Sequence, residues 1–393
     1  MNVMKVAYLN YFDLLNPPSW TRSEYGFIYT NYNKAKSLES LAEVNYVCAL
    51  DYQLSPWRNR QVEVKRWWYE SVWKRRYVHW ATPHLGHSLA QQIQERLKHN
   101  PVDLIIGSDT TLVSQLEVDV PVVLWATNLF TPLLERYPDY QNLCGETIRG
   151  FKDFDRQSLK TCQRFVFPSH WAADNAHQQY AVPRERIDVV PYGANLADEP
   201  SLERVKTAIA QRSEETLNLL FVGVDWQRKG GDLAVAVAGR LNQQGIPTQL
   251  TLVGGRVPQA VEALSYVTSA GFIDKFSEAG AMAMAELFER SHLLVLPSEA
   301  ETYGNVLCEA NAFGVPVLAT AVDGIPTIVK NDRNGRTFPR NEFVEGASMY
   351  VQELFEDRDR YLNLAYQARS EYEQRLNWRV VGETMASILS RCF

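Results

Sequence analysis

Two acidic residues, Glu301 and Glu309, lie in a segment (296–339) whose pattern predicts a buried strand, a loop and the opening of a helix. The first backbone N–H groups of a helix have no intrahelical partner, and with the helix macrodipole they bind anions such as a diphosphate. At ~1.5 Å per residue, Glu309 falls in the second turn, where it could accept hydrogen bonds from both hydroxyls of a ribose. Glu301, at the mouth, could contact a sugar. The pattern therefore predicts a nucleotide-sugar site with backbone donors at Gly304, Asn305 and Val306, beside Tyr303.

Two cations, Arg228 and Lys229, stand at another predicted helix start, after a strand that ends near Gly223. Cations are electrostatically unfavourable at a helix N-terminus unless an anion is bound there. The pair therefore favours a phosphate site, and the alternative is a solvated surface pair.

Little in the sequence supports a metal or a nicotinamide cofactor. His84 and His87 lie three positions apart without a third ligand nearby. The Asp-x-Asp triplets 153–155 and 357–359 fall in predicted helices, so we interpret both as solvated faces. The turn at 254–256 lacks a G-x-G-x-x-G pattern and a suitably placed acidic residue. We expect no metal and no cofactor.

The elements that position these residues follow an alternation of short apolar runs and amphipathic segments, which is typical of βα units around parallel sheets. The alternation restarts after about residue 215, and 393 residues exceed the ~250–300 at which one core usually stops growing. We predict an α/β fold of two doubly wound, Rossmann-like domains that face each other across a cleft. The predicted strands are 3–9, 44–49, 102–106, 120–125, 164–167, 187–190, 217–222, 248–253, 293–296 and 317–319. The predicted helices include 27–41, 88–99, 151–162, 230–243, 281–291 and 304–313.

The expected domains are 1–195 and 196–377, and the amphipathic C-terminal helix 378–393 could pack back on the first domain. Ligands of doubly wound sheets bind outside the carboxyl ends of the strands. We therefore expect the site to lie between the domains.

Charge and composition exclude several classes of protein. The 40 Lys and Arg against 46 Asp and Glu leave a net charge of −6, which argues against a nucleic-acid partner. Five widely spaced cysteines support neither a disulfide framework nor a zinc ribbon. The N-terminus reads as a first strand and not as a signal peptide, and no apolar stretch approaches the ~18–20 residues that cross a bilayer. We expect a reducing, cytoplasmic location.

The segment 62–80 is unusual, with four Trp, two Tyr and five Lys or Arg against two Glu. Such a mixture could make weak peripheral contact with the inner face of a membrane. Alternatively, the aromatic side chains are core or line an acceptor groove while the cations face solvent. We favour the second interpretation.

The region around the two glutamates resembles the donor-site signature of the GT-B retaining glycosyltransferases of family 4 (glycosyl transferases group 1). Pro297-Ser298 precede the glutamates, and 309–317 reads Glu-Ala-x-Ala-x-Gly-x-Pro-Val. Val222-Gly223 followed by Lys229-Gly230 is similar to that family's phosphate-binding loop. The segment 190–195 is similar to its interdomain segment, and Asn334-Gly335 to its closing turn. The resemblance covers about 170–393 well and the first half only loosely.

This resemblance implies a GT-B fold in which 196–377 binds a UDP- or GDP-linked sugar and 1–195 recognises the acceptor. Lys229 would neutralise the donor phosphates, where charge develops in the transition state. Glu309 would hold the ribose and Glu301 the transferred sugar. The implied reaction is metal-independent hexosyl transfer with retention to a glycan, lipid or small-molecule hydroxyl, by same-face attack without a covalent intermediate. Gly223 and Phe272, the latter in the stretch 271–275 expected near the base, complete the donor-binding set.

Three loops of the first domain follow predicted strands and should open on the same cleft. Their polar residues are candidates for contacts with the acceptor or the diphosphate, and Asp109 is one that could orient an acceptor hydroxyl. The candidates are Ser19, Thr21, Arg22, Asp109, Thr127 and Asn128.

The chain departs from the family pattern at three places. Val224 stands where an Arg commonly follows Gly223, and Arg228 is our candidate for the missing phosphate cation. Thr127 and Asn128 stand where the first domain often has a His, and Thr327 where a Glu often follows Gly-Ile-Pro. Two alternatives therefore stay open, a nucleotide-sugar epimerase of the same architecture and a non-catalytic, degenerate transferase subunit.

Overall fold

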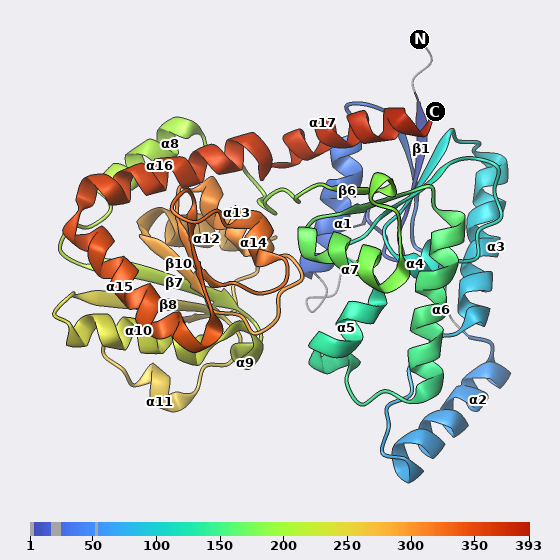
Figure 1. Ribbon diagram of the computed structural model, residues 1–393, viewed down its shortest axis with the longest axis horizontal. Helices are drawn as coiled ribbons and strands as arrows, with labels where there is room; N and C mark the ends of the chain where they lie inside the picture. Colours follow the sequence, from blue (N-terminus) through green and yellow to red (C-terminus); the bar gives the residue numbers. More distant parts are fainter. Residues whose placement is uncertain (1–3, 17–24, 52–53) are drawn as a thin grey trace. The chain divides into compact units, whose positions relative to one another are not determined.

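The computed structural model describes residues 4–16, 25–51 and 54–393. The chain divides into two compact units, Met1–Val190 with Gly382–Phe393, and Pro191–Val381. In each unit, helices lie on both sides of one parallel sheet (Figure 1). The C-terminal helix α17 (Trp378–Leu389) runs from the second unit into the first.

The sheet of unit 1 has six strands in the order β2-β1-β3-β4-β5-β6, and all of its pairs are parallel. All four residues of β3 and of β4 are buried, as expected for strands covered on both faces. The strands are β1 (Lys5–Leu9), β2 (Glu43–Val47), β3 (Leu104–Gly107), β4 (Val122–Trp125), β5 (Arg164–Phe167) and β6 (Ile187–Val189). The helices are α1 (Tyr25–Leu38), α2 (Pro56–Trp67), α3 (Pro83–His99), α4 (Thr110–Val113), α5 (Phe130–Arg136), α6 (Gly145–Thr161) and α7 (His170–Tyr180).

The sheet of unit 2 also has six parallel strands, in the order β12-β11-β10-β7-β8-β9. The strands are β7 (Leu217–Gly223), β8 (Thr248–Gly254), β9 (Val267–Gly271), β10 (Leu293–Leu296), β11 (Val317–Thr320) and β12 (Gly335–Phe338). The helices are α8 (Leu202–Gln211), α9 (Trp226–Lys229), α10 (Gly231–Gln243), α11 (Gln259–Glu262), α12 (Glu278–Arg290), α13 (Asn305–Ala312), α14 (Ile325–Ile328), α15 (Phe343–Glu356) and α16 (Arg358–Arg375). The prediction of two Rossmann-like α/β domains is confirmed.

The two strands that the sequence did not predict, β9 and β12, are the edge strands of the unit 2 sheet. Three of the five residues of β9 are exposed. In β12 only Gly335 is buried, and the other three residues are partly buried. An edge strand is covered less than a central one, so it has no continuous apolar run to reveal it.

Each sheet has one place where the order of the strands reverses. In unit 1 it lies between β1 and β3, and in unit 2 between β7 and β10. Loops that leave the carboxyl ends of the two strands at such a switch point diverge, and the opening between them is where ligands of α/β sheets bind. The loops after β1, β3, β7 and β10 are therefore the places to look for chemistry.

Candidate functional site

The switch point of unit 2 holds an ion pair between Lys229 and Glu301. Lys229 ends α9, which follows β7, and Glu301 lies in the loop after β10. The Nζ of Lys229 donates to Oε2 of Glu301, and the two side chains are only 15% and 10% exposed. Two residues that are 72 positions apart in sequence, and that the sequence analysis placed in one site, are thus in direct contact.

Glycines allow the two loops to approach each other closely. Gly230 has φ 77°, and a Cβ there would lie 2.2 Å from the carbonyl oxygen of Pro297. A Cβ at Gly223 would lie 2.9 Å from Cγ of Lys229, so the lysine stem packs across bare backbone. A side chain at either position would displace the loop that carries the Lys229 ammonium group.

Arg228, the candidate for the additional phosphate cation, is engaged with protein groups. Its guanidinium donates to the carbonyl of Ala300 at 3.1 Å and pairs with Asp225 at 3.3 Å. The same guanidinium lies 4.0 Å from Glu301. Arg228 therefore ties α9 to the loop of Glu301, and a direct contact with phosphate stays a prediction.

The backbone of Glu301 is fixed by the loop that follows β11. Its N–H donates to the carboxylate of Asp323 at 3.0 Å, and its carbonyl accepts from the N–H of Gly324 at 3.0 Å. A Cβ at Gly324 would lie 2.1 Å from the carbonyl oxygen of Thr302, so only glycine fits. The sequence analysis did not identify Asp323 and Gly324, because two different loops must be placed side by side to see their role.

The N-terminus of α13 lies beside the Glu301 carboxylate. Gly304, the N-cap, has φ 100°, and a Cβ there would lie 3.3 Å from Cγ of Glu301. Within the described residues, no side chain caps this end of the helix, and Asn305 and Val306 are half-buried. The backbone expected to bind a diphosphate thus lies next to an acidic side chain.

Tyr303 has a structural side chain. It is 2% exposed, its hydroxyl donates to the carbonyl of Tyr192 at 2.8 Å, and its ring packs on that of Tyr192 at 5.0 Å between centroids. Burial raises the pKa of the Tyr303 hydroxyl well above its ordinary value. Only the backbone of Tyr303 is therefore available for the donor contacts that the sequence analysis predicted.

Glu309 lies one turn further along α13 and is 2% exposed. Its carboxylate accepts from Nζ of Lys275 at 2.5 Å. A buried carboxylate must be paired to offset the cost of its desolvation, and Lys275 supplies the charge. Lys275 lies in the stretch 271–275 that the sequence analysis expected near the base, but its pairing with Glu309 was not predicted, because it follows the unpredicted strand β9.

Two exposed apolar side chains stand at the same edge of the sheet. Phe272 directly follows β9 and is 49% exposed, and Val224 directly follows β7 and is 68% exposed. Since β7, β8 and β9 are neighbours, the two residues belong to loops on one side of the switch point. An exposed ring there is suited to stacking on a base, and this role of Phe272 stays a prediction.

The corresponding switch point of unit 1 carries a closed hydrogen-bond network. Asn10, after β1, donates to Ser108 Oγ at 3.0 Å, and the hydroxyl of Tyr11 donates to Asp109 at 2.8 Å. Asp109 also accepts from the N–H of Thr111 at 2.8 Å and so caps α4. Burial raises the pKa of Asp109 above its ordinary value. The structure therefore gives Asp109 two structural partners, and its contact with an acceptor stays a prediction.

A buried lysine lies under the same edge. Lys34, in α1, is 1% exposed, and its Nζ donates to the carbonyl of Trp125 at 2.9 Å, at the end of β4. Burial lowers the pKa of Lys34 to about 7, and the charge of Asp109 opposes this shift. The sequence analysis missed Lys34, because a single lysine in an amphipathic helix gives no sign that it points inward.

For the other candidates of unit 1 that lie within the described residues, the structure shows no contact that points to a ligand. Thr127 and Asn128 are half-buried after β4, and Asn128 donates to the carbonyl of Leu129 at 2.6 Å. Ser19, Thr21 and Arg22 lie outside the described residues.

The interpretation of 153–155 as a solvated face is wrong for Asp155. Its side chain is buried and accepts from the backbone N–H groups of Phe130 and Thr131, each at 3.1 Å, and from the hydroxyl of Tyr180 at 2.9 Å. Burial raises the pKa of Asp155 to about 6, although these donors oppose the shift. Asp155 thus fixes the start of α5.

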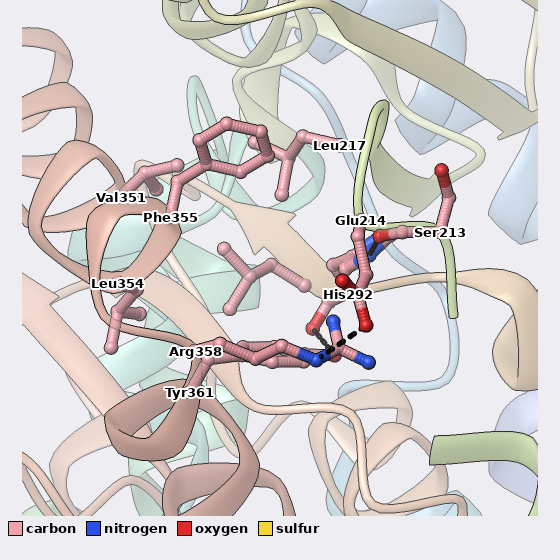
Figure 2. Close-up of a pocket in the computed structure, with 10 residues that line it drawn as sticks. Ser213, Glu214, Leu217, His292, Val351, Leu354, Phe355, Arg358 and Tyr361 are labelled. Atoms are coloured by element: carbon pink, nitrogen blue, oxygen red, sulfur yellow. Dashed lines mark hydrogen bonds and ion pairs between the residues drawn. The ribbon is translucent and has the colours of Figure 1, made fainter. Parts of the chain in front are cut away.

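A separate pocket of unit 2 lies at the opposite edge of the sheet (Figure 2). It is lined by Leu217 and Leu293, the first residues of β7 and β10. Nδ1 of His292 accepts from the backbone N–H of Asn218 at 2.9 Å, and Nε2 donates to the carbonyl of Ser213 at 2.7 Å, so the ring serves the packing there. Because it adjoins the amino ends of the strands, this pocket is not the expected ligand site.

Among the described residues, no cluster of three or more His, Cys, Asp or Glu side chains is arranged to hold a metal ion. In the same part of the chain, no helix has both the length and the apolar character needed to span a bilayer.

Comparisons with known proteins agree with this geometry. Residues 204–371, which contain the Lys229–Glu301 and Lys275–Glu309 pairs, match the family model described as "Glycosyl transferases group 1". A curated relative from Paenarthrobacter aurescens, D-inositol 3-phosphate glycosyltransferase, is 29% identical over 194 residues, which is 48% of each chain. The present chain thus spans about half the length of this relative.

Solved structures are similar over the whole chain. Sucrose-phosphate synthase from Thermosynechococcus elongatus has a TM-score of 0.68 at 16% identity, over 99% of this chain and 98% of that one. HepE from Anabaena, solved in complex with UDP, has a TM-score of 0.63 at 16% identity, over 99% and 100%. These likenesses establish the GT-B fold. Residues 204–371, somewhat less than half of the chain, match the glycosyl transferases group 1 family.

Proposed function

We propose that this protein is a retaining hexosyltransferase that uses a UDP- or GDP-linked sugar and a hydroxyl of a glycan, lipid or small molecule. The observation that carries the proposal is the Lys229–Glu301 pair beside the N-terminus of α13, which no side chain of the described residues caps. The UDP in the structure of HepE and the name of the curated relative support it.

In this proposal the diphosphate binds at the N-terminus of α13, and Lys229 exchanges Glu301 for a phosphate oxygen. As the bond between the anomeric carbon and the diphosphate breaks, negative charge builds on the leaving oxygen. The Lys229 ammonium and the N–H groups stabilise that charge without having to reorganise. Glu301, released from Lys229, accepts hydrogen bonds from hydroxyls of the sugar.

The acceptor oxygen attacks the anomeric carbon on the face that the diphosphate leaves, and its proton passes to the departing diphosphate. The new glycosidic bond therefore keeps the anomeric configuration, with no covalent intermediate and no metal. Glu309, held by Lys275, accepts hydrogen bonds from the ribose, and Phe272 lies against the base. We place the enzyme in the cytoplasm, with the domain 1–195 on the acceptor side and the domain 196–377 binding the donor.

The test is incubation of the purified chain with a panel of UDP- and GDP-sugars and candidate acceptors, with the products followed by NMR. The proposal predicts free nucleoside diphosphate together with a new glycoside of the donor's anomeric configuration. An inverted product would overturn retention. Conversion of one nucleotide sugar into another would indicate an epimerase, and nucleotide-dependent thermal stabilisation without turnover would indicate a non-catalytic subunit.

A further inference from the structure

Helix α2 and the π-helical turn that follows it, Trp68–Val72, form an exposed aromatic surface on unit 1. None of the residues of either element is buried. The exposed fractions are 68% for Trp57, 62% for Trp67, 50% for Trp68 and 63% for Trp73. Exposed apolar groups that lie next to each other usually mark an interaction site, and here they are among the largest side chains available.

This surface replaces the interpretation of 62–80 as core. Tyr77 is indeed 6% exposed, and Trp80 packs on Phe151 with ring centroids 4.9 Å apart. The remaining three Trp residues of the segment, at 67, 68 and 73, are exposed, so the core interpretation is wrong for them. The difference arises because α2 extends away from the sheet of unit 1, close to one end of α6 (Figure 1).

One face of the helix holds it to unit 1. Lys65 pairs with Glu146, in the first turn of α6, and Tyr69 donates to the same carboxylate at 3.3 Å. The ring of Tyr69 also stacks on Tyr77, with centroids 5.7 Å apart. With Val62, these contacts place positions 62, 65 and 69 toward the protein.

The opposite face carries tryptophan, valine and arginine. At 3.6 residues per turn, positions 57, 60, 64, 67 and 68 share one side of the helix, away from positions 62, 65 and 69. They are Trp57, Arg60, Val64, Trp67 and Trp68, and all five are exposed. The outward face of the helix therefore carries both apolar and cationic side chains. In a helix that only covers a core, the outward face would be polar.

Charge identifies the kind of partner. Segment 56–76 has seven Lys or Arg against two Glu, although the whole chain carries a net charge of −6. Within the described part of the chain, Arg58, Arg60, Arg66 and Lys74 form no ion pair within 4.0 Å. Arg60 shares the side of the tryptophans, and the segment as a whole offers an excess of positive charge to an anionic partner.

From these observations we infer that α2 with Trp68–Val72 docks this protein on the surface of an anionic lipid bilayer. The indole rings lie at the boundary between headgroups and acyl chains, where amphipathic aromatic side chains are favoured. Arg60 and Lys74 meet the headgroup phosphates, and the other cations of the segment add to its positive potential. The docking uses neither the donor site nor a bound nucleotide, so it stands apart from the proposed function.

A bilayer fits this surface better than a sugar acceptor does. A groove that stacks on sugar rings needs facing walls and polar partners, whereas α2 is an exposed helix in which none of the residues is buried. A lipid surface accommodates an exposed helix, and its negative charge complements the excess of Lys and Arg over Glu in 56–76.

The test uses the full chain with vesicles of phosphatidylcholine alone or with about one third phosphatidylglycerol. We expect co-sedimentation only with the anionic vesicles, weakened about 10-fold or more in high salt. Lipids brominated on their acyl chains should quench tryptophan fluorescence of the bound protein. Absence of salt-sensitive binding, or binding without quenching, overturns the inference.

Two variants locate the contact. W57S/W67S/W68S should lose quenching and at least about 10-fold in binding, and R58Q/R60Q/R66Q should lose the dependence on anionic lipid. The matched control L202S/M349S/F393S removes three exposed apolar side chains elsewhere and should bind as the unaltered chain does. Thermal unfolding confirms that each variant is folded. If the tryptophan variant keeps vesicle binding but loses transfer to a water-soluble acceptor, the inference is wrong and the segment is an acceptor groove.

Discussion

The two switch points of this molecule both contain lysines and carboxylates, but these groups have different partners. Those of unit 2 pair with each other, whereas those of unit 1 bind neutral groups of the protein. In unit 2, Lys229 pairs with Glu301, and Lys275 with Glu309, next to a helix N-terminus without a side-chain cap in the described chain. In unit 1, the carboxylate of Asp109 accepts hydrogen bonds from Tyr11 and Thr111. Lys34 is buried and donates to the carbonyl of Trp125.

The comparison teaches that topology alone does not make an anion site. Both edges lie at the carboxyl ends of parallel strands, where ligands of such sheets bind. Among the described residues, the unit 2 edge is the one that combines lysine pairs that can change partner with backbone donors at a helix opening. A charge that meets a ligand must be preorganised and still exchangeable, and the unit 1 lysine is buried below the surface instead.

Removal of the Lys229 ammonium should have the largest effect. Lys229→Met should lower kcat/KM for donor turnover by about 100- to 1000-fold, because the leaving diphosphate loses a preorganised charge. Steady-state kinetics would be compared with those of Lys206→Met, which alters an exposed lysine of α8. A decrease in kcat/KM of less than about threefold would contradict the claim that the carboxyl edge of the unit 2 sheet is the anion site.

Neutralisation of Glu309 should act mainly on donor binding. Glu309→Gln should raise the donor KM by about 10- to 100-fold, since the ribose loses a charged acceptor worth ~1.5–3 kcal/mol. The matched control is Glu286→Gln, on the exposed side of α12. An unchanged KM with a lower kcat would place Glu309 outside the ribose contact.

The buried lysine of unit 1 should reveal itself through pH. Burial lowers the pKa of Lys34 to about 7, whereas the unfolded chain keeps the ordinary value of 10.5. The unfolded state thus binds more protons over this range, so the stability contributed by Lys34 is full above pH 10.5 and is lost as the pH falls toward 7. Between pH 7 and 9, urea unfolding should show a gain of about 2 kcal/mol that Lys34→Met lacks.

The control for that measurement is Lys98→Met, on the exposed face of α3, which should keep the full pH dependence. Identical pH profiles for the unaltered chain and Lys34→Met would mean that Lys34 titrates as a surface lysine does. The proposed difference between Lys34, which is held in the interior, and Lys229, which can change partner, would then be wrong.

Arg228 should have the smallest effect of the four. Arg228→Ala should raise the donor KM or lower kcat by ~10-fold, as expected for one charge-assisted hydrogen bond. Because Arg228 also holds the carbonyl of Ala300, Arg228→Lys distinguishes its roles. Recovery by lysine points to the phosphate charge, and no recovery points to the positioning of the Glu301 loop. Unaltered kinetics in Arg228→Ala would reject both roles.

Much of the fold and part of the site could be read from the sequence, and the limits have physical causes. Buried central strands such as β10 are continuous apolar runs, so they and the helix that follows were predicted closely. The edge strands β9 and β12 have no such run, and the pairing of Lys275, which follows β9, with Glu309 was missed. Asp323 was missed for another reason, since its contact with the Glu301 backbone joins two loops that only tertiary packing brings together.

The most direct test is hydrogen–deuterium exchange of the full chain with and without UDP or GDP. We expect a bound nucleoside diphosphate to slow exchange at 304–306, in the loop 224–230 and around Lys275, and to leave exchange in α2 unchanged. Slower exchange only around the pocket of unit 2 that is lined by Ser213, His292 and Arg358, or only in unit 1, would contradict a donor site at the N-terminus of α13.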